Sequence, residues 1–307
     1  MDEVKVSCPA TIANMVCGFD IIGCALHAPQ DYISLRKTNT GTVTIKHIDG
    51  FGLPESPEHN VAGVSLLELM DHIADDIGFE MIIDKRIKPG SGLGSSAASA
   101  AGAVVAANHL LGNAFSNNDL VKFAMAGEKL ASGVKHADNI SPAIFGGITL
   151  IRSIHPLDII SIEGPPFFVT VIHPQIELKT SDARQILRKE VKLKDAIRQW
   201  GNIGGLIAGL MKSDYELIGR SLEDVIIEPM RSILIPRFDE LKKKCIDIGA
   251  LGGGIAGSGP SVFMLSRNEA IAQNVKIVMN DLYTPLGIDF NIYLTRVNYQ
   301  GVSIVPR

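Results

Sequence analysis

The sequence predicts an α+β protein divided into two domains. Its 307 residues exceed one small domain and suit one large domain or two ordinary ones. Hydrophobic residues make up 46% and charged residues 20%, and 30 glycines are spread along the chain, which is typical of soluble globular α/β or α+β proteins. The order strand, helix, strand, helix, strand in the second half favours an α+β sandwich there.

The first half combines short strand patterns with amphipathic helices. Alternating or β-branched segments predict strands at Val4–Ser7, Tyr32–Lys37, Thr42–Ile48 and Phe79–Ile87. Helical spacing of apolar residues, or an Asn/Asp cluster that can begin a helix, predicts helices at Val61–Ile77, Ala97–Leu111 and Asn117–Ser132. The stretch GVKHADNISPAIFGGITLI then leads through a polar loop into another strand.

The second half begins where the composition changes. Proline-punctuated turns in IHPLDIISIEGPP mark the expected domain boundary, which divides the chain into residues 1–158 and 159–307. Beyond the boundary, strands are predicted at Phe167–His173, Ser261–Leu265 and Asp289–Val297. Helical segments are predicted at Asp182–Met211, Arg237–Ile248 and Arg267–Leu282.

The charge and hydropathy of the sequence limit the kinds of partner that the protein can bind. A net charge of −4 and a single basic run, at 242–244, leave no extended positive face for a nucleic acid, and we expect that run to be a solvated helix face. The start lacks a secretory signal, and the richest apolar stretch, Ala97–Leu111, is mostly alanine with polar interruptions, so no membrane partner is expected. We therefore expect a cytoplasmic protein.

The four cysteines point to packing rather than to chemistry. They form no C-x-x-C pair and no cysteine/histidine ligand set. Buried thiols in a reducing compartment are the expected state of Cys8, Cys17, Cys24 and Cys245.

The most informative motif is KPGSGLGSSAASAAGAV, from Lys88 to Val104. A glycine-rich turn that feeds a helix lets backbone N–H groups face an anion, and the helix N-terminus adds partial positive charge. The motif has no Gly-Lys-Ser/Thr of a Walker loop and no G-x-G-x-x-G of a dinucleotide fold. A phosphate site is favoured over the alternative, a tight turn before a closely packed alanine helix.

Hydroxyl groups follow the glycines. Ser95 and Ser96 are placed to cap free N–H groups at the helix start and to offer oxygen to Mg²⁺. A second glycine cluster, Leu251–Leu265, precedes an apolar strand and could let another backbone approach a ligand.

Together, three segments resemble the signature regions of the GHMP kinases: Pro9–Leu26, Lys88–Ala101 and Leu251–Leu265. The resemblance covers nearly the whole chain in the right order. It implies an N-terminal domain like the second domain of ribosomal protein S5, a ferredoxin-like C-terminal α/β sandwich, and MgATP held by a loop distinct from the Walker type. Within the family, CPATIANMVCGFDIIGCAL, GEKLASGVKHADNISPAIFGG, TSDARQIL and EPMRSILIPRF are most similar to members that phosphorylate the side-chain hydroxyl of L-homoserine.

The resemblance also implies site residues for the nucleotide. Mg²⁺ would be held by Ser96 and Glu128, which carry the hard oxygen ligands that magnesium prefers. The ATP-binding residues that it implies are Lys88, Pro89, Gly90, Ser91, Gly92, Leu93, Gly94, Ser95, Ser96, Ala97, Ala98 and Asn60.

A zwitterionic acceptor needs a guanidinium for its carboxylate and an oxygen ligand for its ammonium. By resemblance, the first role falls to Arg184 and Arg231, and the second to Asp20 with Asn14. Arg184 could instead position phosphate. The implied contacts at the rim of the acceptor site are Thr180, His136 and Asn139.

The catalytic residues implied are Asp138, Asn139 and Arg184. Asp138 could act as a base, but phosphoryl transfer through a loose transition state needs little deprotonation in advance, so a route without a base is acceptable. Our hypothesis is that Asp138 is structural.

Other functions remain open at this point. The alternatives are another GHMP kinase, for mevalonate, shikimate or a sugar, and a non-catalytic sensor of ATP and a metabolite. An NAD-dependent oxidoreductase is disfavoured by the failed dinucleotide fingerprint. The family resemblance also implies a homodimer.

Overall fold

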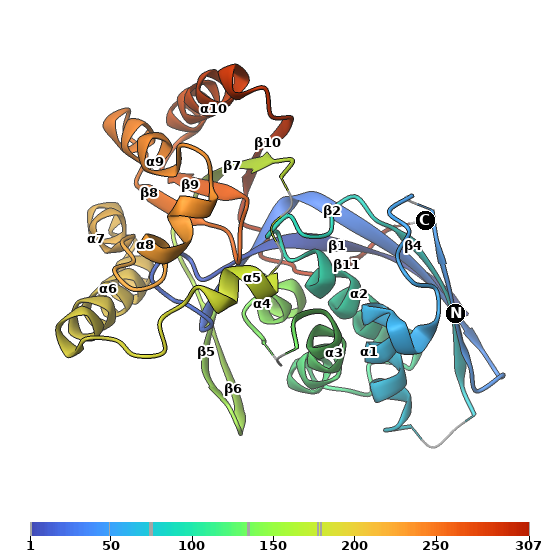
Figure 1. Ribbon diagram of the computed structural model, residues 1–307. Helices are drawn as coiled ribbons and strands as arrows, with labels where there is room; N and C mark the ends of the chain where they lie inside the picture. Colours follow the sequence, from blue (N-terminus) through green and yellow to red (C-terminus); the bar gives the residue numbers. More distant parts are fainter. Residues whose placement is uncertain are drawn as a thin grey trace.

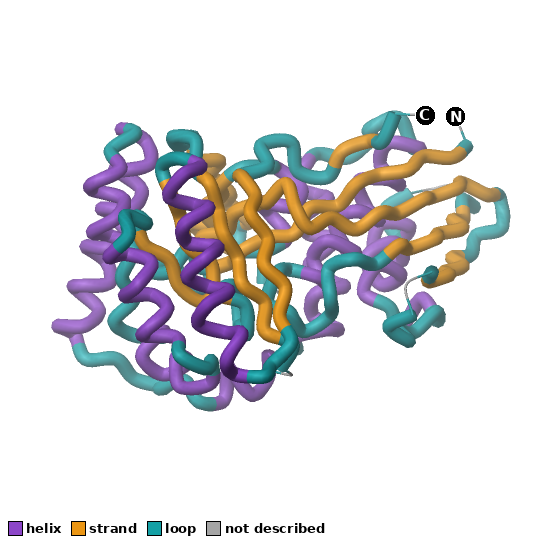
Figure 2. Tube along the Cα trace, turned by 90° about the horizontal axis from the view of Figure 1, so that it is seen from above, coloured by secondary structure: helices purple, strands orange, loops and turns teal. Residues whose placement is uncertain are grey.

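The computed structural model describes residues 2–48, 50–73, 76–133, 136–176, 178 and 180–306. Within these ranges the chain forms two β-sheets, and helices pack against each of them (Figure 1). Seen from above, the two ends of the chain lie together at one end of the molecule (Figure 2). No helix in the described ranges is long and apolar enough to span a membrane.

The first sheet has seven strands, in the order β11-β1-β2-β4-β3, with β5 paired to β2 and β6 to β5. Only the pairing of β3 with β4 is parallel among the described strands. The strand bounds are β1 Glu3–Ala13, β2 Ile22–Thr38, β3 Val43–His47, β4 Gly78–Asp84, β5 Ile148–Ile154, β6 Leu157–Ile162 and β11 Ser303–Ile304.

Four helices cover one face of this sheet (Figure 1): α1 Val61–Met70, α2 Ser95–Leu110, α3 Asn117–Ser132 and α4 Ile140–Phe145. The alanine-rich α2 lies at their centre and contacts α1, α3, α4, β1 and β2. Its small side chains explain this position, because alanine and glycine let neighbouring backbones approach closely. The predicted helix Asn117–Ser132 is confirmed, and a capping box of Ser116 with Asp119 begins it.

The second sheet has four antiparallel strands in the order β10-β7-β9-β8, with β7 Phe168–Pro174, β8 Gly252–Ile255, β9 Val262–Ser266 and β10 Phe290–Arg296. In chain order this is the 4-1-3-2 arrangement of a ferredoxin-like sandwich. The helices are α5 Thr180–Gln185, α6 Leu193–Lys212, α7 Tyr215–Ser221, α8 Glu228–Arg231, α9 Phe238–Asp247 and α10 Glu269–Tyr283. The α+β class is therefore confirmed.

Several sequence predictions are wrong in detail. The helix expected to reach Ile77 ends at Met70, and β2 starts at Ile22, ten residues before the predicted strand. The basic run is not wholly solvated, because Lys242 is paired with Glu228, and both side chains are largely buried. The expected boundary at 158/159 falls inside β6 and stays a prediction.

The four cysteines are buried free thiols, as their spacing predicted.

Candidate active site

One cavity of about 320 Å³ brings together most of the residues that the sequence singled out. Its wall includes Asn14, Asp20, Asn60, Pro89, Gly90, Ser91, Gly92, Gly94, Ser95, Ser96, Glu128, His136, Asp138, Asn139, Arg184 and Arg231. Segments distant in the sequence therefore meet at one place. Sequence reasoning did not identify three further wall residues that matter below, Phe19, Lys85 and Ser99.

The glycine motif forms the turn between β4 and α2. Gly90, Gly92 and Gly94 have φ values of 74°, 81° and 64°, in the left-handed region that favours glycine. A Cβ atom on Gly92 would lie 2.5 Å from the carbonyl oxygen of Ala256. The two glycine clusters thus pack backbone against backbone beside the cavity.

We expect Gly92→Ala to lower the free energy of unfolding by about 1–3 kcal/mol more than Gly90→Ala, because it adds a steric overlap to the unfavourable positive φ. Gly90 is the matched control, since its φ is also positive but a Cβ atom there meets nothing within 4 Å. Urea denaturation of both variants measures the difference. Equal losses would show that the contact with the second glycine cluster is not tight.

Helix α2 starts without a side-chain cap, which corrects one expectation. Its N-cap is Gly94, and neither serine caps a backbone N–H group. The Ser95 hydroxyl donates to the carbonyl oxygen of Ile87 at 2.7 Å, and the Ser96 hydroxyl donates to Oε2 of Glu128 at 2.8 Å. The positive end of the α2 dipole therefore faces the cavity without a competing side-chain oxygen.

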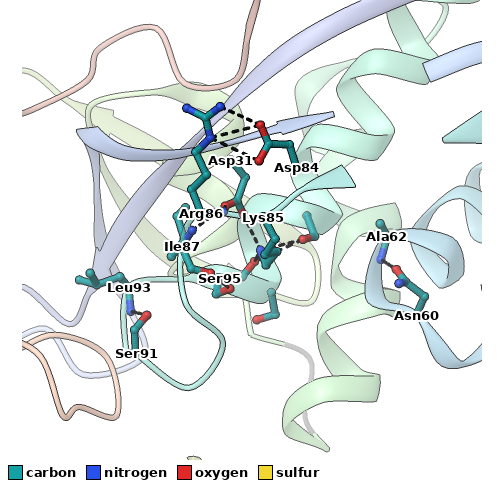
Figure 3. A network of polar contacts seen from close by, with 12 residues as sticks. Asp31, Asn60, Ala62, Asp84, Lys85, Arg86, Ile87, Ser91, Leu93 and Ser95 are labelled. Carbon is teal, nitrogen blue, oxygen red and sulfur yellow. Dashed lines mark hydrogen bonds and ion pairs between the residues drawn. The ribbon is translucent and has the colours of Figure 1, made fainter. Parts of the chain in front are cut away.

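A buried ion pair contacts the start of α2 (Figure 3). The Lys85 ammonium pairs with the Asp31 carboxylate and donates to the Ser95 carbonyl at 2.5 Å and to the Ser99 hydroxyl at 2.9 Å. The other oxygen of Asp31 accepts from the backbone N–H groups of residues 86 and 87, each at 2.7 Å. Because a buried charge is costly unless paired, this network fixes the geometry of the glycine turn.

Two carboxyl groups of the cavity, those of the half-buried Glu128 and the buried Asp138, have raised pKa values. Desolvation raises the pKa of Glu128 to about 7, although its bond from Ser96 acts in the opposite direction. Desolvation, with repulsion from Asp20 and Glu128, raises the pKa of Asp138 to about 7. An environment that disfavours carboxylate charge is one that a divalent cation would relieve.

Asn139 has a fixed amide orientation. Its Oδ1 accepts from the Thr11 hydroxyl at 2.7 Å, and its backbone N–H donates to Oδ1 of Asp138 at 3.1 Å. Since Oδ1 is occupied, the donor Nδ2 is the amide atom left to meet a ligand in the cavity.

Charged groups of both signs meet at another part of the wall. Nη2 of Arg184 donates to both carboxylate oxygens of Asp20, at 3.0 and 3.1 Å. Arg231 is buried, and desolvation together with the neighbouring Arg184 lowers its pKa. Both guanidinium groups lie over the Phe19 ring, at 5.6 and 5.1 Å from its centroid, so one aromatic ring contacts both cations.

His136 lies beside this group. Its Nδ1 is 3.9 Å from Oδ2 of Asp20, and its buried Nε2 has no hydrogen-bond partner among the described residues. Desolvation lowers the pKa of His136, so the neutral ring prevails at pH 7. Asn14 supports the same region, because its Nδ2 donates to the Gly257 carbonyl at 3.0 Å and its Oδ1 accepts from the Asp20 N–H at 3.0 Å.

Several other predicted residues differ in their relation to the cavity. The side chains of Leu93, Ala97 and Ala98 are buried in the core, and the Lys88 ammonium donates to Gln175 at 2.8 Å. Thr180 begins α5, but its side chain lies outside the described part of the chain. The Asn60 side chain lines the cavity while it caps α1, where its Oδ1 accepts from the N–H groups of residues 62 and 63.

Two protein-family models match this chain. Residues 61–147 match the family model of the GHMP kinases N terminal domain, and residues 206–283 match that of the GHMP kinases C terminal domain. The first match contains the glycine motif and Glu128.

Individual relatives extend the match to the whole chain. A homoserine kinase of Chloroherpeton thalassium is 42% identical over 99% of this chain and 100% of its own. The crystal structure of a homoserine kinase from Cytophaga hutchinsonii superimposes with a TM-score of 0.95 at 45% identity, covering 99% of this chain and 98% of that one. An L. major mevalonate kinase, with a TM-score of 0.71 and 14% identity over 95% of each chain, shares the fold.

Proposed function

The chain belongs to the GHMP kinase family, among its homoserine kinases, and from this premise we propose how its cavity performs the reaction. The γ-phosphoryl group of ATP is transferred to the side-chain hydroxyl of L-homoserine, giving O-phospho-L-homoserine on the route to threonine. The observation that carries the proposal is the meeting, in one cavity, of the glycine turn, the Ser96–Glu128 pair and the Asp20–Arg184–Arg231 group.

The glycine turn and the start of α2 bind the phosphates of ATP. Left-handed glycines leave backbone N–H groups accessible, and the uncapped helix start adds partial positive charge. Ser96 and Glu128 fit Mg²⁺, because their oxygens are 2.8 Å apart and the half-buried Glu128 carboxylate lacks full solvation. When bound, Mg²⁺ would neutralise part of the negative charge of the ATP phosphates.

The charged group binds the acceptor. Arg231 and Arg184 meet the homoserine carboxylate, and Asp20 meets its ammonium, so binding exchanges the Arg184–Asp20 ion pair for pairs with the substrate. Because both ends of the amino acid are then fixed, its hydroxyl is directed toward Asn139 and the γ-phosphate. Phosphoryl transfer depends mainly on such positioning.

No strong base is required in this proposal. The fixed Nδ2 donor of Asn139 faces the acceptor hydroxyl, the proton passes to the transferred phosphate, and Asp138 orients the Asn139 backbone. We expect Asp138→Asn to keep kcat within about tenfold of the natural protein, since asparagine resembles the neutral carboxyl and a general base would contribute about 10²–10⁴-fold. Steady-state kinetics and an ATP-binding titration measure this. A folded variant that binds ATP but has lost turnover would make Asp138 the base.

The rival acceptors differ in charge. Mevalonate and shikimate carry a carboxylate but no ammonium, so they would leave the carboxylate of Asp20 without its counterpart. A sensor without catalysis has no need of Ser96 and Glu128 side by side.

An ATP-dependent assay with homoserine, serine, threonine, mevalonate and shikimate in parallel tests the function. We expect kcat/KM for homoserine to exceed the others by about 10²-fold or more, because buried polar groups reject ligands that leave them unpaired. A preference for mevalonate would overturn the acceptor but keep the kinase, and no turnover with any of the five would overturn both.

We also propose a homodimer, two domains divided near residue 158, and a cytoplasmic location. A cytoplasmic location suits four reduced thiols.

An apolar stripe of exposed residues on α6 supports the dimer: Leu193, Ile197, Trp200 and Met211 are 56–73% exposed. These residues recur at helical spacing with Gly204 between the bulky ends, so two copies could pack stripe to stripe. Sedimentation of the natural protein should give a mass of twice the 32.9 kDa chain, and sedimentation of Trp200→Asp should give the mass of a single chain. A monomeric natural protein would contradict the dimer.

A further inference from the structure

The loop Asn14–Asp20, here called the substrate loop, has an unfavourable backbone. Asn14, Met15, Val16 and Asp20 have φ values of 74°, 41°, 68° and 62°. The left-handed region is poor for most side chains and worst for a β-branched residue such as Val16. Since Asn14, Phe19 and Asp20 of this loop line the cavity, its conformation must be held by bonds from elsewhere.

Gln199 on α6 supplies such a bond from outside the cavity. Its Nε2 donates to the carbonyl of Cys17, in the middle of the substrate loop, at 2.8 Å. Its Oε1 accepts from the N–H group of Val225 at 3.0 Å. Gln199 is only 5% exposed although its neighbours Arg198 and Trp200 face solvent, so the amide is directed inward. Without Gln199, the carbonyl of Cys17 and the N–H group of Val225 would each lose this hydrogen bond, the first of them in a buried position.

The segment on the other side of Gln199 leads to the second half of the acceptor site. The carboxylate of Asp224 accepts from the N–H groups of residues 226, 227 and 228, which shapes the turn into α8. Arg231 ends α8 and donates to the carbonyl of Ala183 at 3.0 Å and to that of Gly257 at 3.1 Å. Figure 1 shows α6, α7 and α8 on the same side of the molecule.

We propose that Gln199 is a positioning residue for L-homoserine. One amide group ties the loop that carries Asp20 to the segment that carries Arg231, so it sets the spacing between the groups for the two charged ends of the amino acid. The proposal rests on the proposed function, because it concerns the acceptor of that same site. The two bonds of the Gln199 side chain reach no residue of the glycine motif, so nucleotide binding should not depend on Gln199.

Gln199→Met is the sharpest test, because methionine keeps the volume and removes both hydrogen bonds. We expect the KM for homoserine to rise about tenfold or more and the KM for ATP to stay within about twofold, since a small misplacement of binding groups weakens the ligand that spans them. Gln199→Asn keeps an amide that is too short to bridge both partners. It should show the same selective defect, and it serves as the second variant if methionine prevents folding.

Asn202→Ala is the matched control. Asn202 lies three residues further along α6, and its one side-chain hydrogen bond within the described ranges goes to the Glu223 carbonyl at 2.8 Å, so its loss should leave both KM values within about threefold. An unchanged homoserine KM in a folded Gln199 variant would overturn the proposal. Equal rises in both KM values, with a lower melting temperature, would also overturn it by showing a general structural role. Failure of the natural protein to phosphorylate homoserine would instead overturn the proposed function.

Discussion

Glu128→Gln is expected to lower kcat by about 10³-fold while the protein stays folded. Glutamine keeps the shape and an oxygen for the Ser96 hydroxyl, but it removes the charge that would hold Mg²⁺ against the phosphates. Loss of about 4 kcal/mol of transition-state stabilisation corresponds to this factor. Single-turnover kinetics with saturating MgATP and homoserine measure it, and a kcat within tenfold of the natural protein would exclude Glu128 as the metal ligand.

The same substitution should stabilise the ligand-free protein at alkaline pH. Burial raises the pKa of Glu128 from 4.5 to about 7, so the folded state binds its proton more strongly than the unfolded chain. The resulting stability is complete below about pH 4.5 and is lost as the pH rises through about 7. In EDTA, the free energy of unfolding of Glu128→Gln should therefore exceed that of the natural protein by about 3 kcal/mol at pH 8.5 and match it near pH 4. A lower stability of the variant at pH 8.5 would contradict the raised pKa.

Arg231→Met is expected to raise the KM for homoserine by about 10²-fold with little change in the KM for ATP. Each charged hydrogen bond to the substrate carboxylate in a desolvated site contributes about 1.5–3 kcal/mol, and the guanidinium can make two of them. Arg231 also donates to two backbone carbonyls, so some loss of stability should accompany the change. Initial-rate kinetics with each substrate varied in turn measure the effect.

Arg198→Met is the control for this prediction. Arg198 is an exposed arginine on α6 that pairs with Glu223, and surface pairs of this kind contribute little. Its homoserine KM should stay within about threefold of the natural value. A similar rise of the homoserine KM in both variants would show that the rise comes from the loss of a positive charge in general rather than from the loss of a specific contact with the substrate.

The sequence predicted elements where the pattern is local. The helix Asn117–Ser132 was placed correctly because its cap and its apolar spacing lie within a few residues of each other. Strand β6 was missed, because prolines on both sides made LDIISI resemble a linker, and only its pairing with β5 makes it a strand. Helix α4 was missed because its interior contains a proline, and it is stabilised by contacts with α2, α3, β1, β2 and β5.

In the candidate site, too, local sequence patterns could be predicted and contacts between distant residues could not. The glycine turn was visible because its chemistry lies in consecutive residues. The role of Lys85 was not visible, because it depends on an ion pair with Asp31. Asp31 is 54 residues away and becomes a neighbour of Lys85 only when β2 pairs with β4. The pairing of Arg184 with Asp20 could not be predicted either, because Asp20 lies in the first signature region, Arg184 lies in the distant stretch TSDARQIL, and only the fold brings them together.

In the proposed mechanism, the backbone N–H groups of residues 90–97 bind the phosphates of ATP. A crystal structure of the protein with Mg²⁺ and a non-hydrolysable ATP analogue tests it most directly. We expect phosphate oxygens within about 3 Å of several of these N–H groups, with Mg²⁺ beside Ser96 and Glu128. A triphosphate bound away from the glycine turn would contradict it.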